Sequence, residues 1–176
     1  GIQSLDLVGR KMTAKKGANF INFLGEMNKS LVEYKDTEGL EDIAKAVQDA
    51  VNLLAEMGMY FVQCGKEGKF MVPIANAYPF LNMMGNITYG WLLFWQAGIA
   101  QRRLSAILSE NRVDESDKKA VKAFVKEHRD ASFYQGKVMS ARFYARHILP
   151  QAKAVAESIK TEDMSFLSIA DESFAQ

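Results

Sequence analysis

Apolar residues recur along this chain with the three- and four-residue spacing of an α-helix, and the two-residue alternation of a β-strand is nearly absent. The clearest stripe predicts a helix over about 38–64, with Asp36 and Thr37 as candidate caps and glycine after its last turn. The stripe consists of Leu40, Ile43, Val47, Ala50, Leu54, Met57 and Phe61. A shorter helix is predicted over about 18–34, with an inward face made of Leu24, Met27, Leu31 and Tyr34.

The segment 70–108 differs from the others because it carries no charged residue from Phe70 to Gln101. A membrane span of about 20 apolar residues gives such a run, and so does a helix buried on all sides within a bundle. Polar side chains and prolines interrupt the run, namely Pro73, Asn76, Pro79, Asn82, Asn86 and Gln96. We therefore predict a central buried helix, with the membrane span as the alternative.

The last third of the chain predicts one long helix that begins near Asp114 and is kinked or ended by Pro150, after which helix resumes over 151–160. Its predicted inward residues are Val121, Phe124, Val125, Ala131, Val138, Phe143, Leu149, Ala154, Val155 and Ile159. Together the segments predict an all-α fold, a mostly antiparallel four-helix bundle with long helices and a last helix kinked at Pro150.

Composition narrows the class of protein. Apolar residues make up 48% and charged residues 24%, which excludes wholesale disorder. The 22 basic residues balance 21 acidic ones, so no basic excess favours nucleic acid as a partner. The lone Cys64 cannot form an internal disulfide, which favours a reducing compartment and hence the cytoplasm, and we expect it to be an ordinary buried thiol.

The usual catalytic motifs are missing. The chain shows no nucleotide-binding glycine motif, zinc-protease motif or hydrolase nucleophile elbow. A di-iron bundle would need a glutamate three residues before each histidine. Val125 occupies that position before His128 and Tyr144 before His147, so we expect no metal site.

Three groups of side chains have both a functional and a structural interpretation, and we favour the structural one for each. Arg142, Arg146 and His147 suit a phosphate or carboxylate, or form a solvated basic edge at a helix end. The second group either lines a ligand pocket or belongs to the core, and it consists of Trp91, Phe94 and Trp95. The third group either contacts phosphates or an anionic membrane surface, or is simply solvated. It consists of Arg10, Lys11, Lys15 and Lys16.

Two parts of the chain together resemble a known family. Residues 1–11, which read GIQSLDLVGRK, resemble the end of the catalytic portion of the long-form, FAD-dependent acyl-CoA dehydrogenases, where a Tyr-Glu-Gly-Thr segment leads into this helix end. The second part resembles the helical C-terminal domain of those enzymes, and it comprises residues 75–91, 133–137, 141–144 and 149–150. The resemblance implies three parts: 1–16 as the end of the catalytic portion and a linker, 17–161 as the bundle and 162–176 as a tail.

The resemblance also implies a function for the parent protein. The parent would use FAD to remove hydrogens from the α and β carbons of an acyl-CoA thioester, with a glutamate base just upstream of Gly1. This chain would then contain no catalytic or metal-binding residue, and only Gly1 would approach the cofactor. Its partners would be the catalytic domains of the same polypeptide and a second subunit in a homodimer. Electron-transfer flavoprotein would be a partner of the parent protein.

On its own, the chain is expected to be inactive and to serve packing or oligomerisation. The alternative is a stand-alone helical module that binds an apolar ligand or a membrane surface.

Overall fold

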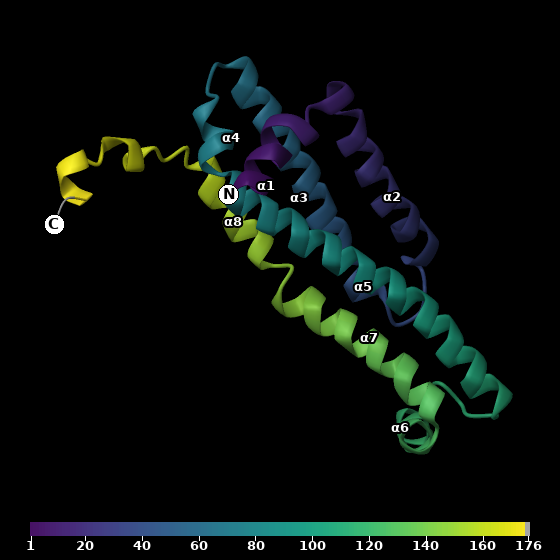
Figure 1. Ribbon diagram of the computed structural model, residues 1–176. Helices are drawn as coiled ribbons and strands as arrows, with labels where there is room; N and C mark the ends of the chain where they lie inside the picture. Colours follow the sequence, from purple (N-terminus) through teal and green to yellow (C-terminus); the bar gives the residue numbers. More distant parts are fainter. Residues whose placement is uncertain (175–176) are drawn as a thin grey trace.

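The structure, a computed structural model, describes residues 1–174 and contains no β-strand within them (Figure 1). Its body consists of four long helices, α2 (Ala18–Tyr34), α3 (Glu41–Lys66), α5 (Ala77–Glu110) and α7 (Arg129–His147). Successive long helices run in opposite directions, which confirms the predicted all-α, mostly antiparallel bundle. The shorter elements are α1 (Ile2–Asp6), the π-helical η1 (Leu7–Lys11), η2 (Ala14–Gly17), α4 (Met71–Ala75), α6 (Lys118–Glu127), α8 (Gln151–Lys160), η3 (Ser165–Ser168) and η4 (Asp171–Phe174).

The apolar stripe predicted over 38–64 is buried along its whole length in α3, as expected. The helix itself begins at Glu41, directly after Leu40. Asp36 and Thr37 do not cap it, so that prediction is wrong. They lie in the preceding turn, where the Thr37 carbonyl accepts a hydrogen bond from the Leu40 N–H at 3.0 Å.

The segment 70–108 forms most of two helices, α4 and α5, which separate at Asn76. The Asn76 side-chain amide donates to the Val72 carbonyl at 3.0 Å, which ends α4. Pro79 lies in the first turn of α5, where a missing N–H costs no helical hydrogen bond. Helix α5 packs against α2, α3, α7 and α8, which confirms the predicted central helix. It is not buried on all sides, however, since Tyr78, Tyr89 and Ile99 are 45% to 63% exposed. None of the helices described is long and apolar enough to cross a bilayer.

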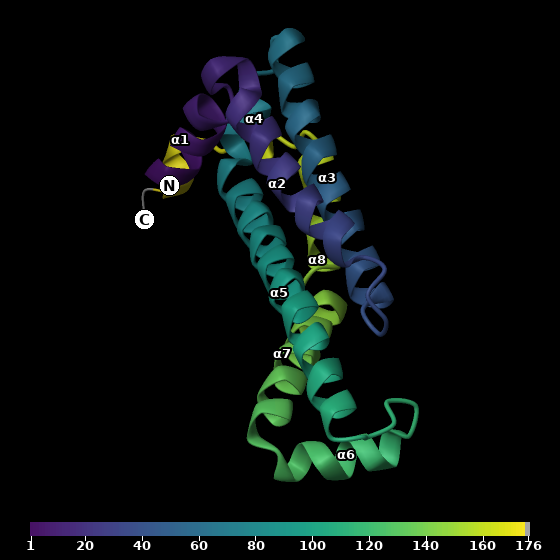
Figure 2. The ribbon, with the colours of Figure 1, turned by 90° about the vertical axis from the view of Figure 1, so that its right-hand side faces the viewer.

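The long helix predicted over 114–150 is wrong, because the chain turns at His128 between α6 and α7. The Asp117 carboxylate caps α6 by accepting from the Lys119 N–H at 2.9 Å, and His128 Nδ1 caps α7 by accepting from the Ala131 N–H at 3.2 Å. The turn lets α6 cross the far end of α5 and α7 (Figure 2). This crossing buries a second, smaller apolar cluster of Leu104, Leu108, Val125 and Ala131.

Two residues predicted to point inward do not. Phe143 is 61% exposed, and Ala154 is exposed on α8. The buried residues of α7 are Ala131, Val138, Ala141 and Ala145. Phe143 lies two residues from both Ala141 and Ala145, and hence on the opposite side of the helix.

The kink predicted at Pro150 is not confirmed. Helix α7 ends at His147 and α8 begins at Gln151, so a short turn separates two helices. Within that turn, the N–H groups of Ile148 and Leu149 both donate to the Tyr144 carbonyl, at 2.9 and 3.2 Å. Helix α8 therefore continues the bundle beyond the end of α7.

A charge at the centre of the α3 stripe tests this packing. Leu54 is fully buried, so Leu54→Asp would place a carboxylate in the core without a partner. We expect a loss of about 4 kcal/mol in the free energy of unfolding, measured by urea unfolding followed by circular dichroism. The exposed Val32→Asp on α2 is the control and should change it by less than about 0.5 kcal/mol. A near-wild-type midpoint for Leu54→Asp would contradict the buried stripe.

Candidate functional site

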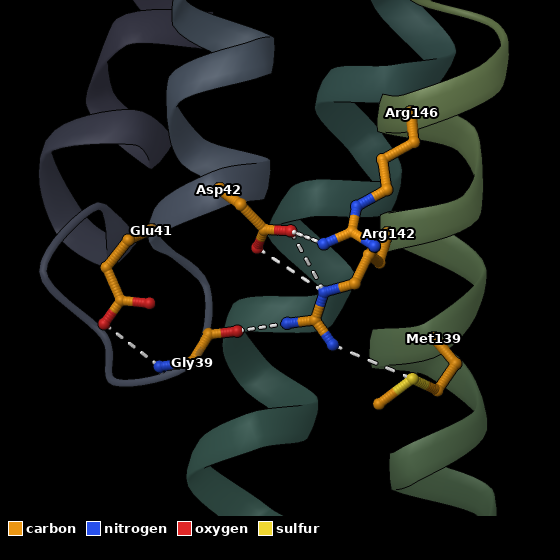
Figure 3. Close-up of polar contacts among 6 residues, drawn as sticks. All are labelled: Gly39, Glu41, Asp42, Met139, Arg142 and Arg146. Carbon is orange, nitrogen blue, oxygen red and sulfur yellow. Dashed lines mark hydrogen bonds and ion pairs between the residues drawn. The ribbon is translucent and has the colours of Figure 1, made fainter.

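Two of the three candidate anion-binding residues are bound to a carboxylate of the protein itself. Asp42, in the first turn of α3, accepts from Arg146 Nη2 at 2.8 Å and Arg142 Nε at 3.2 Å (Figure 3). Arg142 also donates to the Gly39 carbonyl. The ring of His147 lies against Phe143 instead, with centroids 4.5 Å apart. The arginines therefore join the start of α3 to α7, and the structural interpretation holds for them.

The same contacts perturb the titration of Asp42. Partial burial opposes its ionisation, but the hydrogen bond from Arg146 and the positive charge of Arg142 outweigh burial. The pKa of Asp42 consequently lies below its ordinary value. The network thus stabilises the folded state more when the carboxylate is charged.

The aromatic group on α5 belongs mainly to the core. Phe94 is fully buried and Trp91 is nearly so, with the Trp91 ring packed edge-on against Phe23 of α2 at 6.1 Å. Trp95 stacks on Trp91 and remains 42% exposed. These three side chains do not enclose a ligand pocket, and Trp95 marks where the aromatic core reaches the surface.

The four basic residues near the N-terminus divide between different environments. Arg10 pairs with Asp6 one turn earlier, at 2.6 Å between Nε and Oδ1. Lys15 and Lys16 both adopt left-handed backbone conformations in the turn before α2. The Lys16 side chain lines a groove described below.

The remaining candidate positions carry no assembled chemistry. Cys64 is buried in the inner face of α3. Gly1 begins the exposed start of α1, where its carbonyl accepts from the Ser4 hydroxyl at 2.7 Å. Within residues 1–174, no three His, Cys, Asp or Glu side chains gather as metal ligands would.

The outer face of α5 is an apolar surface that faces solvent. Its residues follow the alternating four- and three-residue spacing of a helix-packing seam. We call this surface the α5 seam, and it consists of Leu81, Gly85, Thr88, Leu92, Trp95 and Ile99. The Thr88 hydroxyl donates to the Met84 carbonyl at 2.7 Å, so this hydroxyl is satisfied within the helix. A shallow hollow of about 320 Å³ lies between the seam and Leu7 of η1.

A second apolar surface is hollowed between η1, α2, α3 and α4. This α2–α4 groove has a volume of about 870 Å³. Its rim carries five apolar side chains that are 48% to 69% exposed, namely Ile21, Met59, Val62, Phe70 and Ile74. The polar side chains that line it are Thr13, Lys16 and Lys66. Exposed apolar side chains gathered around a hollow are typical of a surface that another molecule covers.

A polar cluster holds the point where the C-terminal tail leaves the bundle. The Tyr60 hydroxyl donates to Glu162 at 2.9 Å, and Lys69 pairs with the same carboxylate at 2.9 Å. Burial and the hydrogen bond to Glu162 raise the pKa of Tyr60 above its ordinary value. Glu162 has a left-handed backbone, so the chain changes direction there.

Comparison with known protein families gives a match for most of this chain. Residues 23–170 match the family described as "Acetyl-CoA dehydrogenase C-terminal like", a match over most of the chain. The chain belongs to this family. Membership confirms the resemblance to the C-terminal domain of acyl-CoA dehydrogenases that the sequence suggested.

Individual relatives of this acyl-CoA dehydrogenase C-terminal domain are much longer proteins. A butyryl-CoA dehydrogenase of Syntrophomonas wolfei subsp. wolfei is 25% identical over 173 residues, which cover 97% of this chain and 25% of the relative. The broad-specificity linear acyl-CoA dehydrogenase FadE5 of Mycobacterium tuberculosis is 24% identical over 178 residues, which cover 98% of this chain and 26% of the relative. The chain thus spans about a quarter of the length of these relatives.

Removing the charge of Asp42 tests the network in Figure 3. We expect Asp42→Asn to lower the free energy of unfolding by about 1 kcal/mol at pH 7, a modest loss because the Asp42 side chain is 41% exposed. Because the folded-state pKa is depressed, the contribution is complete above the unfolded pKa of about 3.9 and is lost as the pH falls through the folded value. Urea unfolding at pH 7 and pH 3 should show the two proteins converging at pH 3.

The matched control is Asp49→Asn, which breaks an exposed pair with Lys45 at 3.5 Å on the same helix. We expect this control to change stability by less than about 0.5 kcal/mol at either pH. Equal losses in both variants, or a loss at Asp42 that does not depend on pH, would contradict the role given to the network.

Proposed function

We propose that this chain is the C-terminal helical domain of a flavin-dependent acyl-CoA dehydrogenase and that it acts by packing on the catalytic part of the enzyme. Family membership supports the parent activity, and the α5 seam is the observation that carries the packing role. A regular apolar seam on a central helix is suited to contact with another packed element.

The chemistry of the parent would then belong to preceding polypeptide. When bound there, FAD would accept the hydride from the β carbon of the thioester, while a glutamate just upstream of Gly1 removes the α proton. Residues 1–16 would be the end of that catalytic portion and a linker. Of this chain, only Gly1, which is exposed, would approach the cofactor.

The remaining partners follow from the same proposal. The parent would act on an acyl-CoA, form a homodimer and deliver electrons to electron-transfer flavoprotein. Its unpaired, buried Cys64 suits a reducing compartment such as the cytoplasm.

Charges placed in the seam test the packing role in the complete dehydrogenase. The variant is Gly85→Lys with Ile99→Lys, both at exposed positions, where a side chain at Gly85 meets no neighbour. We expect thermal unfolding to split into two transitions, because the bundle would no longer unfold together with the flavin-containing part. The bundle alone should keep its wild-type melting temperature.

The matched control is Asn82→Lys with Ser109→Lys, which adds the same charge to exposed positions of α5 outside the seam. We expect this enzyme to unfold in one transition, like the wild type. A single, unshifted transition for the seam variant as well would show that the seam is not the packing surface.

Catalytic silence of the chain alone is a separate expectation. The purified 176-residue chain should be colourless and should reduce no artificial electron acceptor when an acyl-CoA is added. The complete dehydrogenase, assayed in parallel, should be yellow and active. Flavin that copurifies with the chain alone would overturn this expectation without bearing on the seam.

A further inference from the structure

The C-terminal tail exposes apolar side chains away from the bundle. Beyond Glu162 the chain forms only the short turns η3 and η4 and leads away from the helices (Figure 1). Four large apolar side chains of the tail are 46% to 74% exposed, namely Phe166, Leu167, Ile169 and Phe174. Such a concentration within a few residues costs free energy in water unless another surface covers it.

The α2–α4 groove matches the tail in polarity. Most of the side chains that line its roughly 870 Å³ are apolar, and its rim is the exposed apolar set described above. Apolar side chains of an extended or turn-forming segment fit into such a groove in many peptide complexes. Tail and groove are thus two exposed apolar surfaces of the same chain.

Their charges are complementary. From residue 161 to residue 174 the chain has no basic residue, whereas it carries Glu162, Asp163, Asp171 and Glu172. The groove is lined by Lys16 and Lys66 and by no acidic side chain. The backbone of Lys16 is left-handed at this point of the groove. Opposite charges would orient the tail and speed its docking.

The tail is not positioned to enter its own groove. The groove-lining residues Gly58, Val62 and Gly65 of α3 share one face, because they are spaced by four and three residues. Tyr60, which holds Glu162, lies two residues from both Gly58 and Val62 and therefore on the opposite face of α3. In the structure, the tail therefore starts on the face of α3 opposite the groove residues Gly58 and Val62, and it leads away from the helices (Figure 1).

We infer that the tail of one copy, residues 163–174, docks in the α2–α4 groove of a second copy. A two-fold axis lets two copies exchange tails, so that each groove receives the tail of the other. The lysines at the groove then face the tail carboxylates, and the tail aromatics and aliphatics are covered. This inference depends on the tail and groove alone and not on the dehydrogenase assignment.

A charge exchange between two variants tests the inference on the full 176-residue chain. One variant carries Lys16→Glu with Lys66→Glu in the groove, and the other carries Asp171→Lys with Glu172→Lys in the tail. We expect the wild-type chain to be a dimer by light scattering and each variant alone to self-associate roughly tenfold or more weakly. An equimolar mixture should recover the dimer, because each tail then meets a groove of opposite charge.

The controls separate charge from folding. The variant Lys122→Glu with Lys126→Glu makes the same change on exposed positions of α6 and should leave the dimer intact. A chain that ends at Glu162 should be monomeric and keep its wild-type helical content by circular dichroism. A monomeric wild-type chain, a truncated chain that is still a dimer, or a mixture that recovers nothing would each overturn the inference.

Discussion

The structure depends on one constraint, the burial of a helix that carries no charge over most of its length. Helix α5 has no acidic or basic side chain from Ala77 to Gln101, so exposing the apolar side chains on any of its faces to water is unfavourable. Helices α2, α3, α7 and α8 pack against it. Glycines bring them close: at Gly98 an added Cβ would lie 2.3 Å from the Tyr34 ring. The α5 seam is the face of this helix that remains exposed or partly exposed.

Apolar packing has no direction of its own, and ion pairs at the edges fix how the helices are aligned. Asp42 fixes the start of α3 against α7, and Lys160 pairs with Glu56 to fix α8 against α3. On the other side of α5, Arg102 pairs with Glu33 at 3.3 Å and lies over the ring of Tyr34 at 4.3 Å. Each contact adds little stability alone, but each one penalises a shifted alignment.

Periodicity predicted the long helices over 18–34 and 38–64 and the buried stripe of α3, because both are local properties of the sequence. It missed the turn at His128, where a side-chain cap outweighs an uninterrupted helical pattern. It also placed Phe143 inward, although Phe143 lies two residues from both Ala141 and Ala145 and therefore on the opposite side of α7 from the buried face. The α2–α4 groove was not predictable, since its lining comes from five elements, η1, η2, α2, α3 and α4, that only the fold brings together. In α5, an apolar pattern on all sides does not indicate which side stays uncovered.

The two apolar surfaces are separate, yet one short element joins them. Leu7 of η1 lines the hollow beside the α5 seam, and the next residue, Val8, lines the α2–α4 groove. A π-helical turn is a wider and rarer form of helix, and here it directs two consecutive apolar side chains toward different surfaces. Any displacement of residues 1–11 therefore changes both surfaces at once. A partner that binds this segment would therefore change the shape of both the groove and the hollow beside the seam. The first turns of the chain couple the two surfaces in this way.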